Sequence, residues 1–137
     1  MSNDRKIYVT TSDMQRLQAL IEGMSSGRLA EAADALESEL STAEVVPPEK
    51  IPADVVTMNS KVRFVDEQTG HQREVTLVYP KEADAAQGKI SILAPVGAAI
   101  IGLSVGQSVD WPLPGDRIKR LKIVEVLYQP EAAGTDA

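Results

Sequence analysis

The stretch that most constrains the fold is Lys89–Gly106, which reads KISILAPVGAAIIGLSVG. Its first residues, 90–93, are mostly β-forming, so the stretch opens as a strand. Pro95 ends this strand, because proline has no amide hydrogen to donate to a neighbouring strand. Proline is tolerated in the first turn of a helix, and the apolar residues of 96–103 recur at helical spacing. We therefore predict a strand, a tight corner, a two-turn helix, a turn and then a further strand.

Small residues within and after this helix determine how it packs. Gly97, Ala98 and Ala99 carry no bulky side chain, so the helix can lie close to a sheet. Either Gly102 or Gly106 can supply the left-handed backbone conformation with which such a helix ends. The three glycines are not spaced as in a phosphate-binding loop, so packing and turn formation are their expected roles.

The N-terminal third of the chain predicts a pair of helices. Apolar residues recur at helical spacing over 14–21, and a seam of alanine and leucine runs from Leu29 to Ala43. Ser12 has the spacing of a capping residue for the first helix, and Gly23 ends it. Because the connecting turn is short, we expect an antiparallel hairpin, a short coiled coil about 20 to 25 Å long. The tip of this hairpin consists of Met24, Ser25, Ser26, Gly27 and Arg28.

A proline-rich connector, Val45–Pro52, follows the hairpin and predicts a boundary near residue 51. The part after it reads as strands joined by turns, one of them the hairpin turn Gln68–His71. We place the long apolar strand 118–128 in the centre of the sheet and expect the tail from Gln129 to fray. The predicted strands cover residues 62–65, 75–79, 90–93, 107–113 and 118–128.

Composition excludes several kinds of active site. The chain has no cysteine and a single histidine, His71, which excludes thiolate nucleophiles and multi-histidine metal sites. A serine triad is disfavoured, because His71 is the only imidazole that could act as its base. No metal or cofactor is expected. The serines considered as nucleophiles are Ser60, Ser91, Ser104 and Ser108.

Charge and hydropathy restrict the partners. The formal net charge is −6, and there are only one Phe, one Trp and three Tyr, so strong nucleic-acid binding is not expected. A protein partner with a basic surface fits this charge better. The N-terminus has no signal segment, and the apolar run 90–105 is interrupted and too short to span a bilayer. We expect a cytoplasmic protein without membrane contact.

Two groups of charged residues have alternative interpretations. Glu31 and Asp34, three residues apart on the second helix, either complement the helix dipole or hold Mg²⁺ through their carboxylates. A basic cluster near the start of the last strand either forms a solvated strand edge or contacts an acidic partner. The first interpretation is favoured for both groups. The basic cluster consists of Arg117, Lys119, Arg120 and Lys122.

The segment ISILAPVGAAIIGLSVGQSVDWPLPGD resembles the C-terminal signature of the bacterial transcript-cleavage factors GreA and GreB. That signature has the form IS-x-x-SP-[IVM]-x-x-A-[LI]-[LI]-G-x-x-x-G-D-x-V, and Asp54–Phe64 is similar to the family's entry strand. Four shorter motifs, DVVTMNS, TLVYP, APVGAA and YQPEAAG, more closely resemble the Rnk branch, the regulators of nucleoside diphosphate kinase. The resemblance covers nearly the whole chain and is weakest over residues 1–53.

The resemblance implies an α+β fold, with a short helical hairpin (1–51) before an FKBP-like antiparallel-sheet domain with one short helix (52–137). It also implies RNA polymerase as the partner, docked by the globular domain at the rim of its secondary channel. The resemblance to the Rnk branch further implies competition with Gre factors for this place. The docking residues that the family pattern assigns are Ser91, Leu93, Ala94 and Pro95, with Leu93 replacing an acidic residue of the pattern.

Two departures from the Gre pattern disfavour transcript cleavage. The acidic tip motif, of the form GD-L-S-E-N, is absent, and this chain reads GMSSGRLAEAAD there. The predicted hairpin is also too short to carry Glu31 and Asp34 to the catalytic Mg²⁺ of polymerase. We therefore expect a non-enzymatic regulator that occupies the channel entrance.

Two alternatives remain at this stage. An FKBP-like fold suggests a peptidyl-prolyl isomerase, but fold alone does not determine function, and such a site needs an aromatic-rich pocket. The helical seam could instead mediate self-association. The aromatic residues available to the second domain are Phe64, Tyr79, Trp111 and Tyr128.

Overall fold

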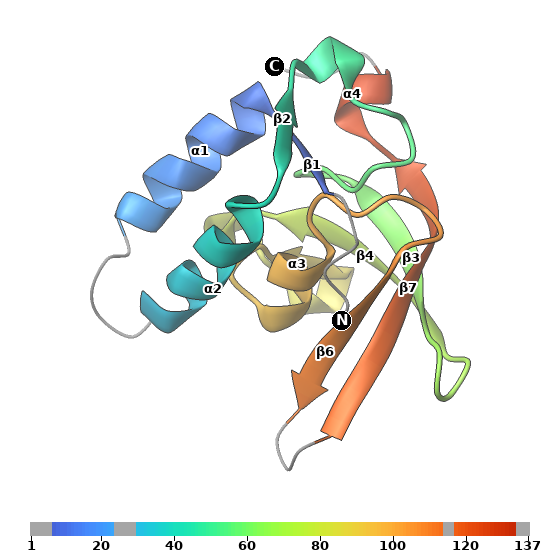
Figure 1. Ribbon diagram of the computed structural model, residues 1–137. Helices are drawn as coiled ribbons and strands as arrows, with labels where there is room; N and C mark the ends of the chain where they lie inside the picture. Colours follow the sequence, from blue (N-terminus) through green and yellow to red (C-terminus); the bar gives the residue numbers. More distant parts are fainter. Residues whose placement is uncertain (1–6, 24–29, 114–116, 134–137) are drawn as a thin grey trace.

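The computed structural model describes residues 7–23, 30–113 and 117–133 (Figure 1). Helices α1 (Thr11–Glu22) and α2 (Ala30–Leu40) lie side by side and antiparallel, as predicted. Their apolar seams face inward, and the central leucines Leu17 and Leu36 are fully buried. The predicted tip, 24–28, lies outside the described residues. No helix in the described part of the chain is long and apolar enough to cross a membrane.

The ends of both helices differ from the prediction. Thr10, and not Ser12, is the N-cap of α1, because its Oγ1 accepts a hydrogen bond of 3.0 Å from the amide of Asp13. Helix α2 ends at Leu40, before the predicted Ala43. After Leu40 the hydroxyls of Ser41 and Thr42 donate to backbone carbonyls of the last turn, and the chain turns away.

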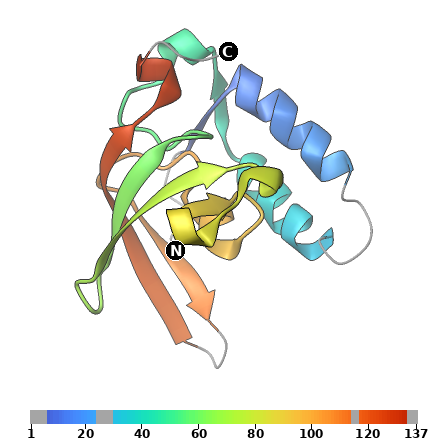
Figure 2. The same ribbon diagram turned by 180° about the vertical axis from the view of Figure 1, so that it is seen from behind.

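A five-stranded sheet forms the second part of the molecule, in the order β5-β4-β3-β7-β6. All neighbours are antiparallel except β4 and β5, so the sheet is mixed rather than antiparallel throughout. The parallel pair arises because the chain crosses over between β4 and β5 through two 3₁₀ turns (Figure 2, yellow). The central strand is β3, and the long strand β7 lies beside it. The strands are β3 (Lys61–Asp66), β4 (Gln72–Val78), β5 (Lys89–Ser91), β6 (Ser108–Leu113) and β7 (Arg117–Tyr128), and the 3₁₀ turns are η3 (Pro80–Glu82) and η4 (Ala85–Gln87).

A second, two-stranded sheet was not predicted. Strand β1 (Tyr8–Thr10) precedes the helix pair in the chain and strand β2 (Glu44–Val46) follows it. The two strands pair in parallel. The proline-rich connector then forms a 3₁₀ turn, η2 (Pro48–Lys50). Strand β1 is also joined to the second part of the molecule, because the Tyr8 amide donates to the Gly102 carbonyl over 3.1 Å.

The helix pair and the sheet share one core. Leu17 and Leu36 belong to the same cluster of buried apolar side chains as Ile100 and Ile123, which lie after residue 51. Side chains alternate along β3 between this buried face and an open face. The division at residue 51 therefore remains a prediction about folding units, since no gap in the packing marks it.

The tail is ordered further than expected. Gln129 is only 3% exposed, and its Nε2 donates to the carbonyls of Pro52 (2.8 Å) and Val55 (2.9 Å). Its Oε1 accepts from the Ala132 amide and so holds the short helix α4 (Pro130–Ala133). The expectation that the chain frays is therefore wrong for residues 129–133, because the side-chain amide of Gln129 satisfies backbone groups at three places, and residues 134–137 lie outside the described residues.

Candidate functional site

The candidate site is the corner that follows β5. The Ile92 amide donates to the Val78 carbonyl over 2.8 Å, which extends the pairing of β5 with β4 by one residue. The chain then turns back on Ser91, whose Oγ accepts from the Leu93 amide (2.9 Å) and whose carbonyl accepts from the Ala94 amide (3.0 Å). Ser91 therefore builds the turn with both its side chain and its backbone.

Helix α3 (Pro95–Ile100) begins directly after this turn. Pro95 occupies its first turn, as predicted, and Ala94 is an N-cap that makes no side-chain hydrogen bond. The helix has six residues, which is shorter than the predicted two turns. Gly102 and Gly106 then adopt left-handed conformations, with φ of 82° and 94°, so both supply the turns expected of them.

Gly97 sets the distance between α3 and the corner. A Cβ atom at this position would overlap the Ser91 carbonyl oxygen and would lie 3.1 Å from Ile92 Cα. Both neighbours are backbone atoms, so neither can move aside as a flexible side chain would. The prediction that small residues let this helix lie close to the sheet is confirmed.

The four residues assigned to docking come together in this corner, but they differ in exposure. Ser91 and Ala94 are half-buried, whereas the Leu93 side chain is only 8% exposed and belongs to the core cluster. Leu93 thus occupies the position of an acidic residue in the Gre pattern with its side chain turned inward. Of Ser91, Leu93 and Ala94, the two that a partner can touch are Ser91 and Ala94. The side chain of Pro95, the fourth residue assigned to docking, lies outside the described residues.

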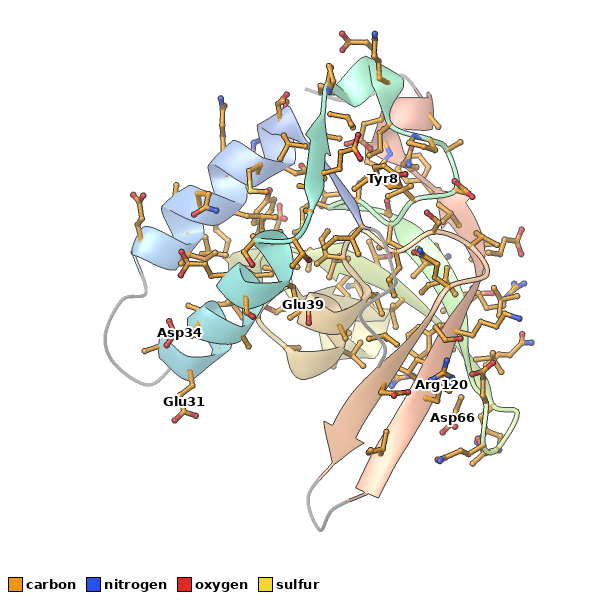
Figure 3. The ribbon with its side chains drawn as sticks, in the orientation of Figure 1. Tyr8, Glu31, Asp34, Glu39, Asp66 and Arg120 are labelled. Carbon is orange, nitrogen blue, oxygen red and sulfur yellow. The ribbon has the colours of Figure 1, made fainter. Side chains whose placement is uncertain are left out.

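The carboxylates considered as Mg²⁺ ligands lie elsewhere. Glu31 and Asp34 are exposed at the beginning of α2 and point away from the molecule (Figure 3). Within the described ranges, no group of three or more potential ligand side chains is close enough to hold a metal ion. The pair fits the dipole interpretation, since Glu31 lies in the first turn of its helix.

The basic cluster is not a strand edge, because β7 has neighbours on both sides. Arg120 pairs with Glu67 (3.0 Å) and with Asp110 (2.7 Å), and Lys119 lies 3.7 Å from Asp66. Figure 3 shows Arg120 and Asp66 at the same end of the sheet, far from α2. Lys119 and Arg120 are therefore occupied by carboxylates of the protein, whereas Lys122 is exposed and makes no ion pair with the described residues. The side chain of Arg117 lies outside the described residues.

Phe64, Tyr79 and Tyr128 do not line a shared pocket, and the side chain of Trp111 lies outside the described residues. Phe64 is buried in the core, and Tyr79 and Tyr128 line different grooves. Among the serines, Ser60 is buried and hydrogen-bonded to Thr57, while His71 lies exposed in the β3–β4 turn. These placements support neither the isomerase nor the serine triad.

Sequence reasoning missed the environment of Tyr79. This residue lines a shallow apolar groove of about 540 Å³ with Arg16 and Leu20 of α1. Its hydroxyl is shielded from solvent and, among the described residues, is the one buried side-chain polar atom without a hydrogen-bond partner. Burial and the nearby Asp13 carboxylate raise the pKa of Tyr79 to about 12, and Arg16 opposes the shift.

Replacing Tyr79 with phenylalanine is expected to leave stability at neutral pH unchanged or to raise it by about 1 kcal/mol. In the wild type, folded Tyr79 keeps its proton up to its pKa of about 12, whereas the unfolded chain loses it near pH 10. The unfolded state then binds fewer protons, so stability falls as pH rises through this range, by roughly 3 kcal/mol at most and by about half of that at pH 11. Urea unfolding at neutral pH and at about pH 11 measures the effect. An equal alkaline loss in Tyr79→Phe would contradict this assignment.

Comparisons with known proteins agree with this geometry. Residues 51–128, which contain the whole corner, match the family described as "Transcription elongation factor, GreA/GreB, C-term", and residues 5–46 match "Rnk N-terminus". The "Regulator of nucleoside diphosphate kinase" of Escherichia coli (strain K12) is 44% identical over 128 residues, with 93% of each chain covered. "Transcription elongation factor GreA" of Azorhizobium caulinodans is 39% identical over 108 residues, covering 79% of this chain and 66% of that protein.

A solved structure shows the same architecture. The "Prokaryotic transcription elongation factor GreA/GreB from Nitrosomonas europaea" aligns with a TM-score of 0.72 and 50% identity, over 90% of this chain and 98% of that chain. The sheet, the corner helix and the helix pair thus define a GreA-like fold. The chain belongs to the GreA/GreB family of transcription elongation factors. Within this family it is a homologue of Rnk, the regulator of nucleoside diphosphate kinase.

Proposed function

We propose that this protein binds RNA polymerase through the Ser91–Pro95 corner, occupies the entrance of the secondary channel and competes there with Gre factors. The observation that supports this most directly is the corner itself, which lies inside the segment that matches the GreA/GreB C-terminal family. The corner presents the half-buried Ser91 and Ala94 on a backbone held by Gly97. A rigid surface of this kind loses little conformational entropy on binding.

The same proposal includes no stimulation of transcript cleavage. The helices α1 and α2 have 12 and 11 residues, and a helix rises about 1.5 Å per residue, so each is about 18 Å long. The residues between them, 23–29, read GMSSGRL and contain no carboxylate. A short hairpin without an acidic tip has neither the reach nor the ligands to hold a second Mg²⁺ at the polymerase active centre.

The variant Ala94→Asp separates docking from folding. Aspartate is a preferred N-cap, and Ala94 occupies an N-cap without a side-chain hydrogen bond, so the variant should be as stable as the wild type or about 1 kcal/mol more stable. The new carboxylate must be desolvated when the corner meets a partner, which should weaken polymerase binding by about tenfold or more. Binding is measured with purified core polymerase, and stability by thermal unfolding.

Ala53→Asp is the matched control, because Ala53 is exposed in the connection between η2 and β3, outside the corner. It should bind like the wild type. If Ala94→Asp also binds like the wild type, the corner is not the docking surface. A competition experiment with a Gre factor on stalled complexes tests the rest: mutually exclusive binding without RNA cleavage is expected, and cleavage would contradict the proposal.

A further inference from the structure

The open face of the five-stranded sheet carries a row of polar side chains near one end. Lys89 of β5 is paired with Thr76 of β4, Thr76 with Lys61 of β3, and Lys61 with Tyr128 of β7. Directly paired residues project from the same face of a sheet where the register is regular. The pairing of β3 with β7 shifts register between Lys61 and Val62, and Tyr128 is placed beside Lys61 by the groove that both residues line. Thr76 alternates with the buried Val75 and Leu77, so this face is the one away from the core. Four side chains from four strands thus form one continuous line.

A groove follows this row. Its volume is about 380 Å³, and all four members of the row line it. Asn59 lies at its border with a left-handed backbone, φ 66°, which is held by a hydrogen bond of 2.6 Å from its amide to the Leu77 carbonyl. The complete lining consists of Asn59, Lys61, Thr76, Val78, Glu82, Lys89 and Tyr128.

The two lysines of the groove differ from Arg63, which lies two residues after Lys61 on β3. Arg63 is neutralised by Glu74 of β4 (2.6 Å) and by Glu125 of β7 (2.9 Å). Lys61 and Lys89, by contrast, make no ion pair within the described ranges. The charge of Lys61 only adds to the hydrogen bond from Arg63 in lowering the pKa of Glu74. With Glu82 as its only carboxylate, the lining has a net charge of +1, although the whole chain carries −6. A positive site retained in an acidic protein favours an anionic ligand.

Strand spacing indicates which anion fits. Neighbouring strands lie about 4.8 Å apart, so the backbones of Lys61 and Lys89 are separated by about 10 Å, with Thr76 between them. Two flexible ammonium groups at this separation can each hold one phosphate of a diphosphate, and the Thr76 hydroxyl can donate to the oxygens between them. Tyr128 is 43% exposed and lies one strand beyond Lys61, where its ring can stack on a planar base.

We propose that this groove binds a diphosphate group, with Lys61 and Lys89 as its cationic contacts, Thr76 between them and Tyr128 beside a base where the ligand has one. Glu82 at the border can accept a hydrogen bond from a ligand hydroxyl. The proposal does not depend on polymerase binding, because the groove and the Ser91–Pro95 corner share no residue.

Titration of the full chain with sodium pyrophosphate, followed by amide chemical shifts, tests the site. Lys61→Gln and Lys89→Gln are each expected to weaken binding by about tenfold, since each removes a charged hydrogen bond. Lys122→Gln is the matched control, because Lys122 is an exposed lysine of β7 outside the groove. It should change the affinity less than about twofold. Equal weakening by all three variants, or no saturable shift at residues of the groove, would overturn the proposal.

A second titration with ADP distinguishes the two sources of the diphosphate. If the ligand is a nucleotide, ADP binds more tightly than pyrophosphate, and Tyr128→Ala weakens ADP by about tenfold without affecting pyrophosphate. If ADP and pyrophosphate bind equally and Tyr128→Ala has no effect, the site is specific for the diphosphate alone. Either result supports the groove, provided that both ligands still require Lys61 and Lys89.

Discussion

Gly97→Ala is expected to lower the free energy of unfolding by about 3 kcal/mol, because a well-packed contact has no room for the added atom. The new Cβ would overlap the Ser91 carbonyl oxygen and lie 3.1 Å from both Ile92 Cα and Leu77 Cδ1. Relief requires α3 to move away from the corner, which would disturb the core that both share. Thermal unfolding should show a melting temperature lower by roughly 10 °C.

Gly23→Ala is the control for this substitution. Gly23 has φ −72°, and the nearest atom to an added Cβ is 3.6 Å away, so the same chemical change meets neither a clash nor backbone strain there. Its effect should stay within about 0.5 kcal/mol of the wild type, or stabilise slightly. If the two variants unfold alike, the close approach of α3 to the corner is not a constraint on this fold.

Leu36→Ala is expected to cost about 3 kcal/mol, because Leu36 is fully buried and the substitution leaves a cavity between the helices and the rest of the core. Since the cluster around Leu36 extends to residues of the sheet, the loss should lower the stability of the whole molecule. Hydrogen exchange should therefore show faster exchange of the protected amides of β3 and β7 as well as those of α1 and α2.

Leu127→Ala makes the same chemical change at a side chain that is 36% exposed, and it should cost less than about 1 kcal/mol. If Leu36→Ala accelerates exchange only in α1 and α2, the two parts are separate folding units. The boundary predicted near residue 51 would then separate two parts that unfold independently.

The corner after β5 could be predicted from sequence, but the exposure of its residues could not, and their docking role was assigned only by the family resemblance. Ser91, Pro95 and the glycines around α3 carry local information, because a missing amide hydrogen or a left-handed φ is a property of one residue. Leu93 is different. Whether an apolar side chain at a corner faces a partner or the core depends on what packs beneath it, and here the core cluster buries it.

Local patterns determined much of the rest. The helical seams of α1 and α2 and the positions of the five strands follow from apolar periods of 3.6 and 2 residues, which any buried face imposes on its own sequence. The predicted lengths and ends of the two helices were less accurate. At Thr10 and after Leu40, side-chain hydrogen bonds to the terminal backbone groups decide where each helix begins or ends.

Only the tertiary structure decided the long-range pairings. The β1–β2 ladder, the parallel placement of β5 and the anchoring of the tail by Gln129 each join segments whose own sequences are too short or too polar to require it. The line of Lys89, Thr76, Lys61 and Tyr128 arises in the same way, since strand register alone brings these residues together. The periodicity of a segment determines which face of the sheet each of its residues occupies. Which residues of other strands lie beside it on that face depends on the free energy of the whole core.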